Sequence, residues 1–310
     1  MNTTRVVLSR SLASSPSSSS ARQLPDFARI LPPDAVFASA QKSGFLKCNR
    51  AQATKVLTEV WETTRSTTIT SSTQDSAFSA AGVAKICAAH NFPPSNFTSL
   101  ALLLQPPASS RTTSPAATTT NLSSILLSLA TSLNDPAAIL KSARSKITSS
   151  RSLILIESSP IWKKLHKLAQ EQDVPEAYEL MAETYQNAKV MGQAQEYWTR
   201  AAAAGSGRAC LVMGRQAVLV GKREVAVQAF KQAAELGEAE AYYELGALQL
   251  SGGVKVAPER NEEAEYNLSV AAASGVTRAA VKLAELYKSR NDLAMSEQWS
   301  EVASEMKAIE

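Results

Sequence analysis

A phased pattern of alanine and glycine in the second half of the chain constrains the fold more than any other feature. Gly205, Gly237 and Gly275 each follow a run of small residues, at intervals of 32 and 38 residues. An alanine stands four residues after each glycine and another stands eleven residues before it: Ala209, Ala241, Ala279 and Ala194, Ala226, Ala264. Self-similarity at such a period indicates stacked structural repeats.

Each repeat is predicted to be a pair of antiparallel helices. Its first helix carries what we call a marker alanine: Ala177, Ala209, Ala241 and Ala279. A large apolar residue follows the marker by four positions and an alanine or glycine follows it by five. In the second helix Trp198, Phe230 and Leu268 stand four residues after an alanine. Small residues against large ones at fixed steps let helix pairs interlock, and the closing glycines fit left-handed helix ends.

These residues resemble Sel1-like repeats, which are relatives of the tetratricopeptide repeat. The resemblance covers about residues 175–310 and is best in Ala241-Tyr-Tyr-Glu-Leu-Gly246, followed by Ser251-Gly-Gly-Val254 and the Ala264 to Gly275 helix. The glycine-rich turn occurs in one unit only, and the second helix of the fourth unit, with Ala294, Trp299 and Met306, departs from the pattern as a capping helix would. The resemblance implies an all-α, right-handed superhelical solenoid that binds proteins as an adaptor or assembly factor.

The first half of the chain differs in composition and is predicted to be partly disordered. Residues 1–160 hold 49 Ser and Thr against 11 in residues 161–310, and 15 basic against 7 acidic residues; the rest has 17 against 21. Residues 26–120 are expected to be a Ser/Thr-rich region, helical or disordered, with a flexible linker at 105–120. Residues 121–174 are expected to be helical and to pack on or cap the solenoid. Leu153–Ile156 is either a short strand or a buried connector.

Residues 1–25 have the composition of a mitochondrial transit peptide. They contain Arg5, Arg10 and Arg22, many serines and no acidic residue, whereas no apolar core of secretory length is present. A disordered cytosolic tail is the alternative. No apolar run reaches the length of a membrane-spanning helix, so the mature chain is expected in the mitochondrial matrix.

Residues that carry chemistry are few and scattered. The two histidines, His90 and His166, have no cysteine or histidine within ligand spacing, and the three cysteines form no CxxC pair. No phosphate-binding glycine loop occurs. The acidic residues around Glu235–Glu244 and Glu259–Glu265 are interpreted as solvated acids at helix starts. The chain is therefore expected to be no enzyme and to hold no cofactor and no metal.

The predicted function is that of a mitochondrial scaffold that binds a protein through the surface of the first helices. The client would be a subunit or assembly intermediate of a respiratory-chain or other mitochondrial complex. The candidate partner-binding residues are Glu179, Glu183, Arg215, Tyr243, Glu244 and Lys282. The alternative is an RNA- or ribosome-associated factor, although residues 161–310 are net acidic and lack a basic stripe. The helix expected at Pro160–Gln172, with Lys163, Lys164 and Lys167 beside an apolar stripe, could instead dock on a membrane or RNA, but covering one end of the solenoid is favoured.

Overall fold

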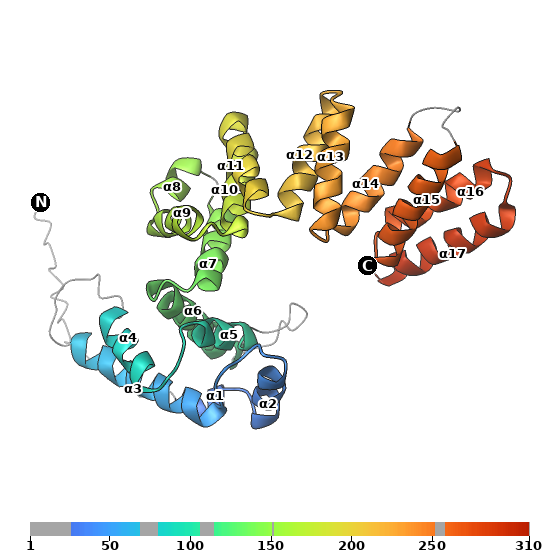
Figure 1. Ribbon diagram of the computed structural model, residues 1–310. Helices are drawn as coiled ribbons and strands as arrows, with labels where there is room; N and C mark the ends of the chain where they lie inside the picture. The colour runs from blue at the N-terminus through green and yellow to red at the C-terminus, as the bar shows by residue number, and fades with distance from the viewer. Residues whose placement is uncertain (1–25, 69–79, 106–114, 151, 252–257, 310) are drawn as a thin grey trace, which may run out of the picture. The chain divides into compact units, whose positions relative to one another are not determined.

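The computed structural model describes residues 26–68, 80–105, 115–150, 152–251 and 258–309, and these contain helices and no strand (Figure 1). The chain divides into two compact units, residues 1–133 and 134–310. Each unit is described separately. The predicted transit peptide, residues 1–25, lies outside the described residues.

The first unit contains six helices. These are α1 Phe27–Ile30, α2 Asp34–Lys42, α3 Arg50–Thr68, α4 Ala80–Ala89, α5 Ser95–Leu103 and α6 Pro115–Ser132. All six contribute buried apolar residues, among them Phe27, Phe37, Val56, Val83, Phe97 and Leu126. The described part of the Ser/Thr-rich region is therefore folded, because its few large apolar residues are spaced to meet in one core.

Side-chain hydrogen bonds to the backbone join the helices of this unit. The buried Asn96 side chain accepts from the Lys47 amide at 3.0 Å, and Ser123 Oγ on α6 donates to the Ala101 carbonyl on α5 at 2.7 Å. The expected linker at 105–120 is shorter than predicted, because α6 already begins at Pro115 and proline is accepted in a first helical turn. Residues 106–114 lie outside the described residues.

The second unit begins with three helices that precede the repeats: α7 Pro136–Ser149, α8 Leu153–Glu157 and α9 Pro160–Gln172. Asp135 caps α7, its carboxylate accepting from the Ala138 amide at 3.0 Å. The Leu153–Ile156 segment is helical and not a strand; Ile156 is buried whereas Ile154 and Leu155 are exposed. The region expected to be helical at 121–174 is divided between the units, because α6 belongs to the first unit and α7 to the second.

Helix α9 covers one end of the repeats, as the favoured interpretation predicted. Its apolar stripe is buried in a common core with α7 and the first repeat; it consists of Trp162, Leu165, Leu168 and Ala169. Ser159 caps the helix by accepting from the Trp162 amide. Lys163 and Lys167 stay exposed, while Lys164 donates to the Asn134 side chain at 3.1 Å.

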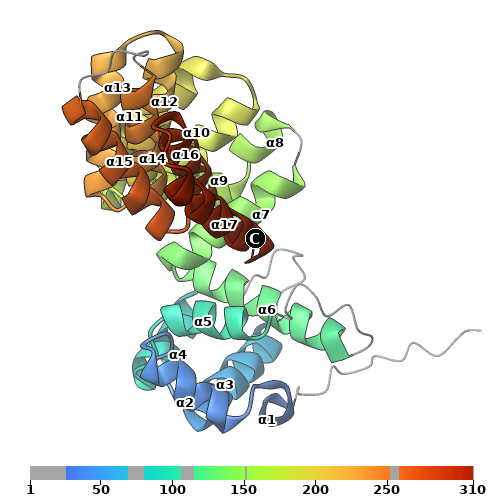
Figure 2. The ribbon, with the colours of Figure 1, turned by 90° about the vertical axis from the view of Figure 1, so that its right-hand side faces the viewer.

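Four helical hairpins follow and stack into the predicted solenoid. Their helices are α10 Pro175–Asn187 with α11 Met191–Ala203, α12 Gly207–Leu219 with α13 Arg223–Glu235, α14 Ala239–Leu250 with α15 Pro258–Ala273, and α16 Thr277–Ser289 with α17 Leu293–Ile309. Figure 2 shows α11, α13 and α15 gathered in one layer and the first helices in the other. The marker alanines are all fully buried.

The closing glycines end the second helices in the left-handed conformation that their spacing predicted. Gly205, Gly237 and Gly275 have φ angles of 92°, 91° and 95°. At the first of them the Gly205 amide donates to Ala202 at 3.1 Å and the next amide donates to Ala201 at 2.9 Å. The same pair of bonds recurs after α13 and α15, so each helix end uses its last carbonyls before the chain turns into the next repeat.

Within a hairpin the small residue of the first helix lies against the large residue of the second. A Cβ added at Gly214 would stand 2.4 Å from the Phe230 ring, and one at Gly246 would stand 2.7 Å from Leu268 and 3.0 Å from the Ala264 carbonyl. The glycines thus make room both for a large side chain and for the facing backbone. The predicted close packing of the two helices in a hairpin is confirmed, and the large side chain occupies the space that the missing Cβ leaves.

The fourth hairpin departs from the register in its second helix, as predicted. Ala294 is exposed, and Ser296 takes the position of the usual alanine, donating from Oγ to the Ala284 carbonyl at 3.0 Å. Ala303 is buried, while Trp299 and Met306 pack partly buried against the last core cluster.

We predict that Gly214→Ala destabilises the second unit. Alanine would add about 1 kcal/mol of helix propensity, but crowding a buried ring costs about 1–3 kcal/mol, so the free energy of unfolding should fall. Urea unfolding followed by circular dichroism measures the change. Gly192→Ala is the matched control, because a Cβ at Gly192 has no neighbour within 4 Å. If both variants gain the same stability, the packing of Phe230 onto Gly214 is not a constraint.

Candidate functional site

The six candidate partner-binding residues all lie on first helices of the hairpins. Glu179 and Glu183 are on α10, Arg215 is on α12, Tyr243 and Glu244 are on α14, and Lys282 is on α16. All six are partly buried, so each has both a neighbour in the protein and contact with solvent. Their equivalent repeat positions place them along one layer of the solenoid (Figure 2).

Between α10 and α12 the two acidic candidates share one arginine. Arg208 Nη2 lies 2.5 Å from Glu183 Oε1, and its Nη1 lies 3.7 Å from Glu179 Oε2. Glu179 also accepts from the Ser206 hydroxyl at 2.5 Å, while Ser206 caps α12 by accepting from the Ala209 amide at 2.8 Å. The Glu179 carboxylate on α10 therefore links the first repeat to the start of α12 in the second repeat.

Between α12 and α14 the candidate Arg215 holds two carboxylates. Its Nε donates to Glu244 Oε1 at 2.8 Å and its Nη2 to Glu240 Oε2 at 2.5 Å. Burial lowers the pKa of Arg215, but these hydrogen bonds and charges outweigh it, and the net pKa is raised. Arg215 therefore stays charged, and the three side chains form a fixed pattern of donors and acceptors.

The same charges continue from α14 to α16. Arg278 Nη2 lies 3.3 Å from Glu240 Oε1, and its guanidinium carbon lies 4.9 Å from the centre of the Tyr243 ring. We call two groups of contacts together the first-helix ladder: Glu179, Glu183 and Arg208 form the first group, and Arg215, Glu240, Tyr243, Glu244 and Arg278 form the second. Lys282 is not a member, because its amine pairs with Glu285 of the same helix at 2.8 Å.

Sequence reasoning missed three charged members of the ladder and Ser206 beside it. Arg208, Glu240 and Arg278 each stand one residue before a marker alanine, and the preceding repeat has Glu176 there. Charge at this position thus alternates in sign from one repeat to the next, which is a readable signal for ion pairs between stacked hairpins. The interpretation of Glu240 and Glu244 as merely solvated acids was wrong, because Arg215 of the preceding repeat pairs with both.

The cysteines and histidines are not brought together with metal-ligand geometry. Among the described residues there is no group of three or more His, Cys, Asp or Glu side chains that could hold a metal ion. His90 Nε2 instead lies 2.5 Å from Glu59 Oε2 within the first unit. All three cysteines are buried free thiols, and burial raises the pKa of Cys48 to about 12 and that of Cys87 to about 11.

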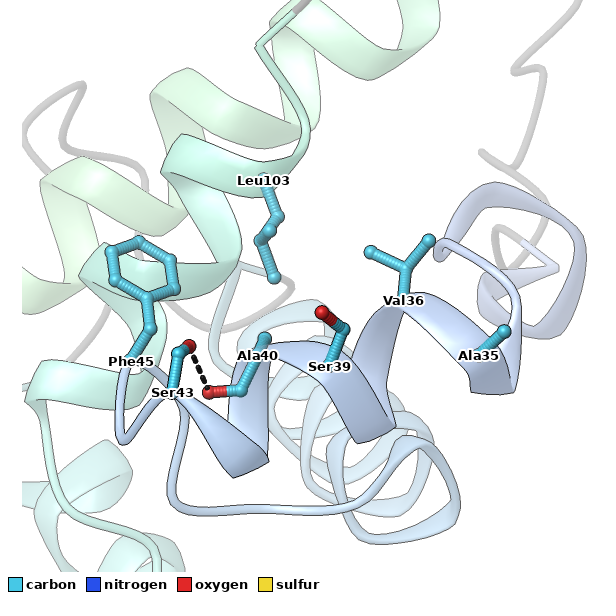
Figure 3. A pocket seen from close by; sticks show the side chains of 7 residues that line it. All are labelled: Ala35, Val36, Ser39, Ala40, Ser43, Phe45 and Leu103. Atoms are coloured by element: carbon cyan, nitrogen blue, oxygen red, sulfur yellow. Dashed lines mark hydrogen bonds between the residues drawn. The ribbon is translucent and has the colours of Figure 1, made fainter.

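A hollow of about 400 Å³ lies in the first unit, beside α2 (Figure 3). Val36, Phe45 and Leu103 supply most of its apolar wall, and Ser39 and Ser43 supply hydroxyls. Ser43 Oγ is already engaged with the Ala40 carbonyl at 3.0 Å. No charged side chain lines this hollow, so it offers no acid, base or anion-binding group.

Geometry thus defines the second unit as a helical-repeat protein of stacked antiparallel hairpins. Its fold is that of Sel1-like repeat proteins: the chain is similar to the crystal structure of a Sel1 repeat protein from Oxalobacter formigenes, at 18% sequence identity and a TM-score of 0.52. That match covers 73% of this chain and 94% of the other. The predicted Sel1-like, tetratricopeptide-related fold is confirmed.

Two structures of MamA are also similar, with lower scores. They share 17% identity and TM-scores of 0.36 and 0.37, and they cover 48% and 55% of this chain and 87% and 92% of their own. No protein-family model matches the chain, and no curated protein sequence matches it. No helix of the described residues is long and apolar enough to cross a membrane.

We predict that the three native thiols resist alkylation in the folded protein. The thiolate is the reacting form, and burial both raises the thiol pKa and blocks access, so iodoacetamide at pH 8 should label none of them within minutes. In urea all three should react, as intact mass spectrometry would show. Gln298→Cys, at an exposed position of α17, is the positive control. Rapid labelling of a native thiol would contradict the buried positions described above.

Proposed function

We propose that this protein is a non-catalytic scaffold that binds a protein partner through the first-helix ladder. The observation that carries the proposal is the ladder, whose two groups of ion pairs each join consecutive hairpins. It spans four successive first helices, and most of its side chains remain partly exposed, for example Arg208 at 49% and Arg278 at 58%. Half-exposed ion pairs contribute only about 0–1 kcal/mol each to stability, so fold stability alone explains this arrangement poorly.

The ladder has the properties of a preorganised recognition surface. Ion pairing fixes the rotamers of Arg215 and Arg278 before a partner arrives, which lowers the entropic cost of binding. Tyr243 lies under the Arg278 guanidinium. Tyrosine and arginine are among the residues that most often contribute the largest part of the binding energy at protein interfaces. Alternating charges of both signs favour a protein segment of mixed charge over a uniformly charged ligand.

We propose further that the protein works in the mitochondrion, most simply in the matrix. The support is the composition of residues 1–25, with three arginines, many serines and no acid. The client would then be a subunit or assembly intermediate of a respiratory-chain or other mitochondrial complex.

RNA or ribosome association is the weaker candidate. The arginines of the ladder each pair with a carboxylate, so a phosphate backbone approaching them would meet Glu183, Glu240 and Glu244 as well. Neutralising phosphates requires basic groups without such neighbours.

The binding proposal predicts that a photo-crosslinking residue at position 243 captures a protein client in intact mitochondria. Arg215→Ala with Arg278→Ala should lower the yield at least about tenfold, since truncated hot-spot residues each cost about 2 kcal/mol. The matched control is the same probe at Tyr266, an exposed tyrosine of the second-helix layer, in the same cells. Equal capture from both positions, or capture of RNA alone, would refute the proposal.

The targeting proposal predicts import of the full chain into isolated mitochondria. Import should depend on the membrane potential, protect the chain from added protease and shorten it at the N-terminus. Replacing Arg5, Arg10 and Arg22 by serine should abolish import, because the attraction of cationic residues to an inside-negative compartment is lost. Import that is unchanged in this triple variant would show that residues 1–25 are not the signal.

A further inference from the structure

The turns inside the hairpins expose apolar side chains that the fold does not use. We call the turns 187–192, 219–224 and 288–293 the hairpin-tip edge. Leu219 and Val220 are 86% and 68% exposed, Met191 and Leu293 are 62% and 64% exposed, and Val190 is exposed as well. The corresponding turn of the third hairpin lies outside the described residues. Exposed apolar groups in such a row mark interaction surfaces more often than chance.

Backbone geometry alone accounts for the shape of these turns. In the second hairpin the chain reverses at Gly221, with φ of 74°, and the Lys222 amide donates to the Ala217 carbonyl at 2.8 Å. The first and fourth hairpins use Lys189 and Asn291 with φ of 61° and 64° in the same way. No apolar side chain is needed to close such a turn, so the exposed ones require another explanation.

The two edges of the solenoid differ in charge as well as in apolar exposure. The hairpin-tip edge carries five basic and two acidic residues. Of these, Asp292 caps α17 by accepting from the Met295 amide at 3.1 Å, and Arg290 Nη1 pairs with Glu265 Oε2 at 2.5 Å. The turns between hairpins, residues 172–177, 204–209, 236–241 and 274–279, carry two basic and four acidic residues. Among their large apolar residues only Leu236 is exposed, because Val174 and Val276 are half-buried.

Repeat geometry brings the tips of the first two hairpins to the same side of the unit. Helices α10 and α12 run in the same direction, so the turns after them lie at the same edge (Figure 1). Lys189 precedes Val190 and Met191, and Lys222 follows Leu219 and Val220 with one glycine between. Each tip thus presents apolar side chains next to an exposed lysine.

We propose that the hairpin-tip edge docks on an anionic lipid surface. Leu219, Val220 and Met191 enter the interface between headgroups and acyl chains. Lys189 and Lys222 rest among the anionic headgroups, since a lysine can keep its stem in apolar surroundings and its amine in water. A fluid lipid surface accepts several convex tips at once without matched shape, whereas a protein partner would need a complementary concave surface. This edge is separate from the first-helix ladder, so the inference stands without the proposed function.

The experiment is flotation of the purified full-length chain with vesicles of phosphatidylcholine, with and without phosphatidylglycerol. Binding is expected only to the anionic vesicles. Leu219→Ser with Val220→Ser should weaken it about tenfold or more, because apolar burial is lost. Lys189→Ser with Lys222→Ser should weaken it about fivefold for each lysine. Leu236→Ser on the opposite edge and Arg215→Ala in the ladder should bind like the unchanged chain, and thermal unfolding checks that every variant folds.

A site-specific readout separates lipid contact from other effects. Because the native thiols are buried, Leu219→Cys can be labelled with an environment-sensitive fluorophore, with Leu236→Cys as the matched control. Anionic vesicles should shift the emission of the first probe to the blue and leave the second unchanged. The proposal is overturned if the chain does not float with anionic vesicles at low salt, if the tip variants float equally well, or if the first probe responds to an acidic protein and not to vesicles.

Discussion

The second and third hairpins of the repeat unit each depend on a large side chain of one helix packing onto a glycine of its partner. Phe230 fills the space over Gly214, and Leu268 fills the space over Gly246. This contact sets the distance between the two helices of a hairpin. The marker alanines are fully buried, and they set the distance between neighbouring hairpins. A core built in this way is filled by apolar side chains from within each repeat. The residues at solvent-facing positions can therefore differ from one repeat to the next.

Those outward positions have separated into two chemically different surfaces. Along the first helices, charges of opposite sign meet between neighbouring repeats, and Arg215 bridges two carboxylates of the next hairpin. Along the hairpin-tip edge, lysines alternate with exposed apolar residues and few acids are present. A solenoid can support both because each surface draws on a different position of the repeat. A protein ligand on one and a lipid surface on the other would together place a client at a membrane.

Sequence patterns predicted the repeat unit well and the first unit poorly. The marker alanine recurs in four repeats and the closing glycine in three, and the same packing rule applies at each, so one pattern predicted the helix pairs and the helix ends. The first unit has no repeat. Its core combines single apolar residues from six helices, such as Phe27 and Leu126, and separated residues of this kind give no local signal of which ones meet. For the same reason the start of α6 at Pro115 was missed, and the Leu153–Ile156 segment was not recognised as helical.

The sequence by itself determined that residues 175–310 form stacked hairpins, where those hairpins end, and which residues lie on the first helices. Only the tertiary structure decided that Arg208 pairs with two of the candidates, that Glu240 and Arg278 join three others, and that Lys282 pairs within its own helix. The reason is that helix periodicity fixes which side of its own helix a residue occupies. The distance to a charge 25 to 38 residues away depends instead on how closely consecutive hairpins stack, and that distance is set by buried contacts between side chains of different repeats.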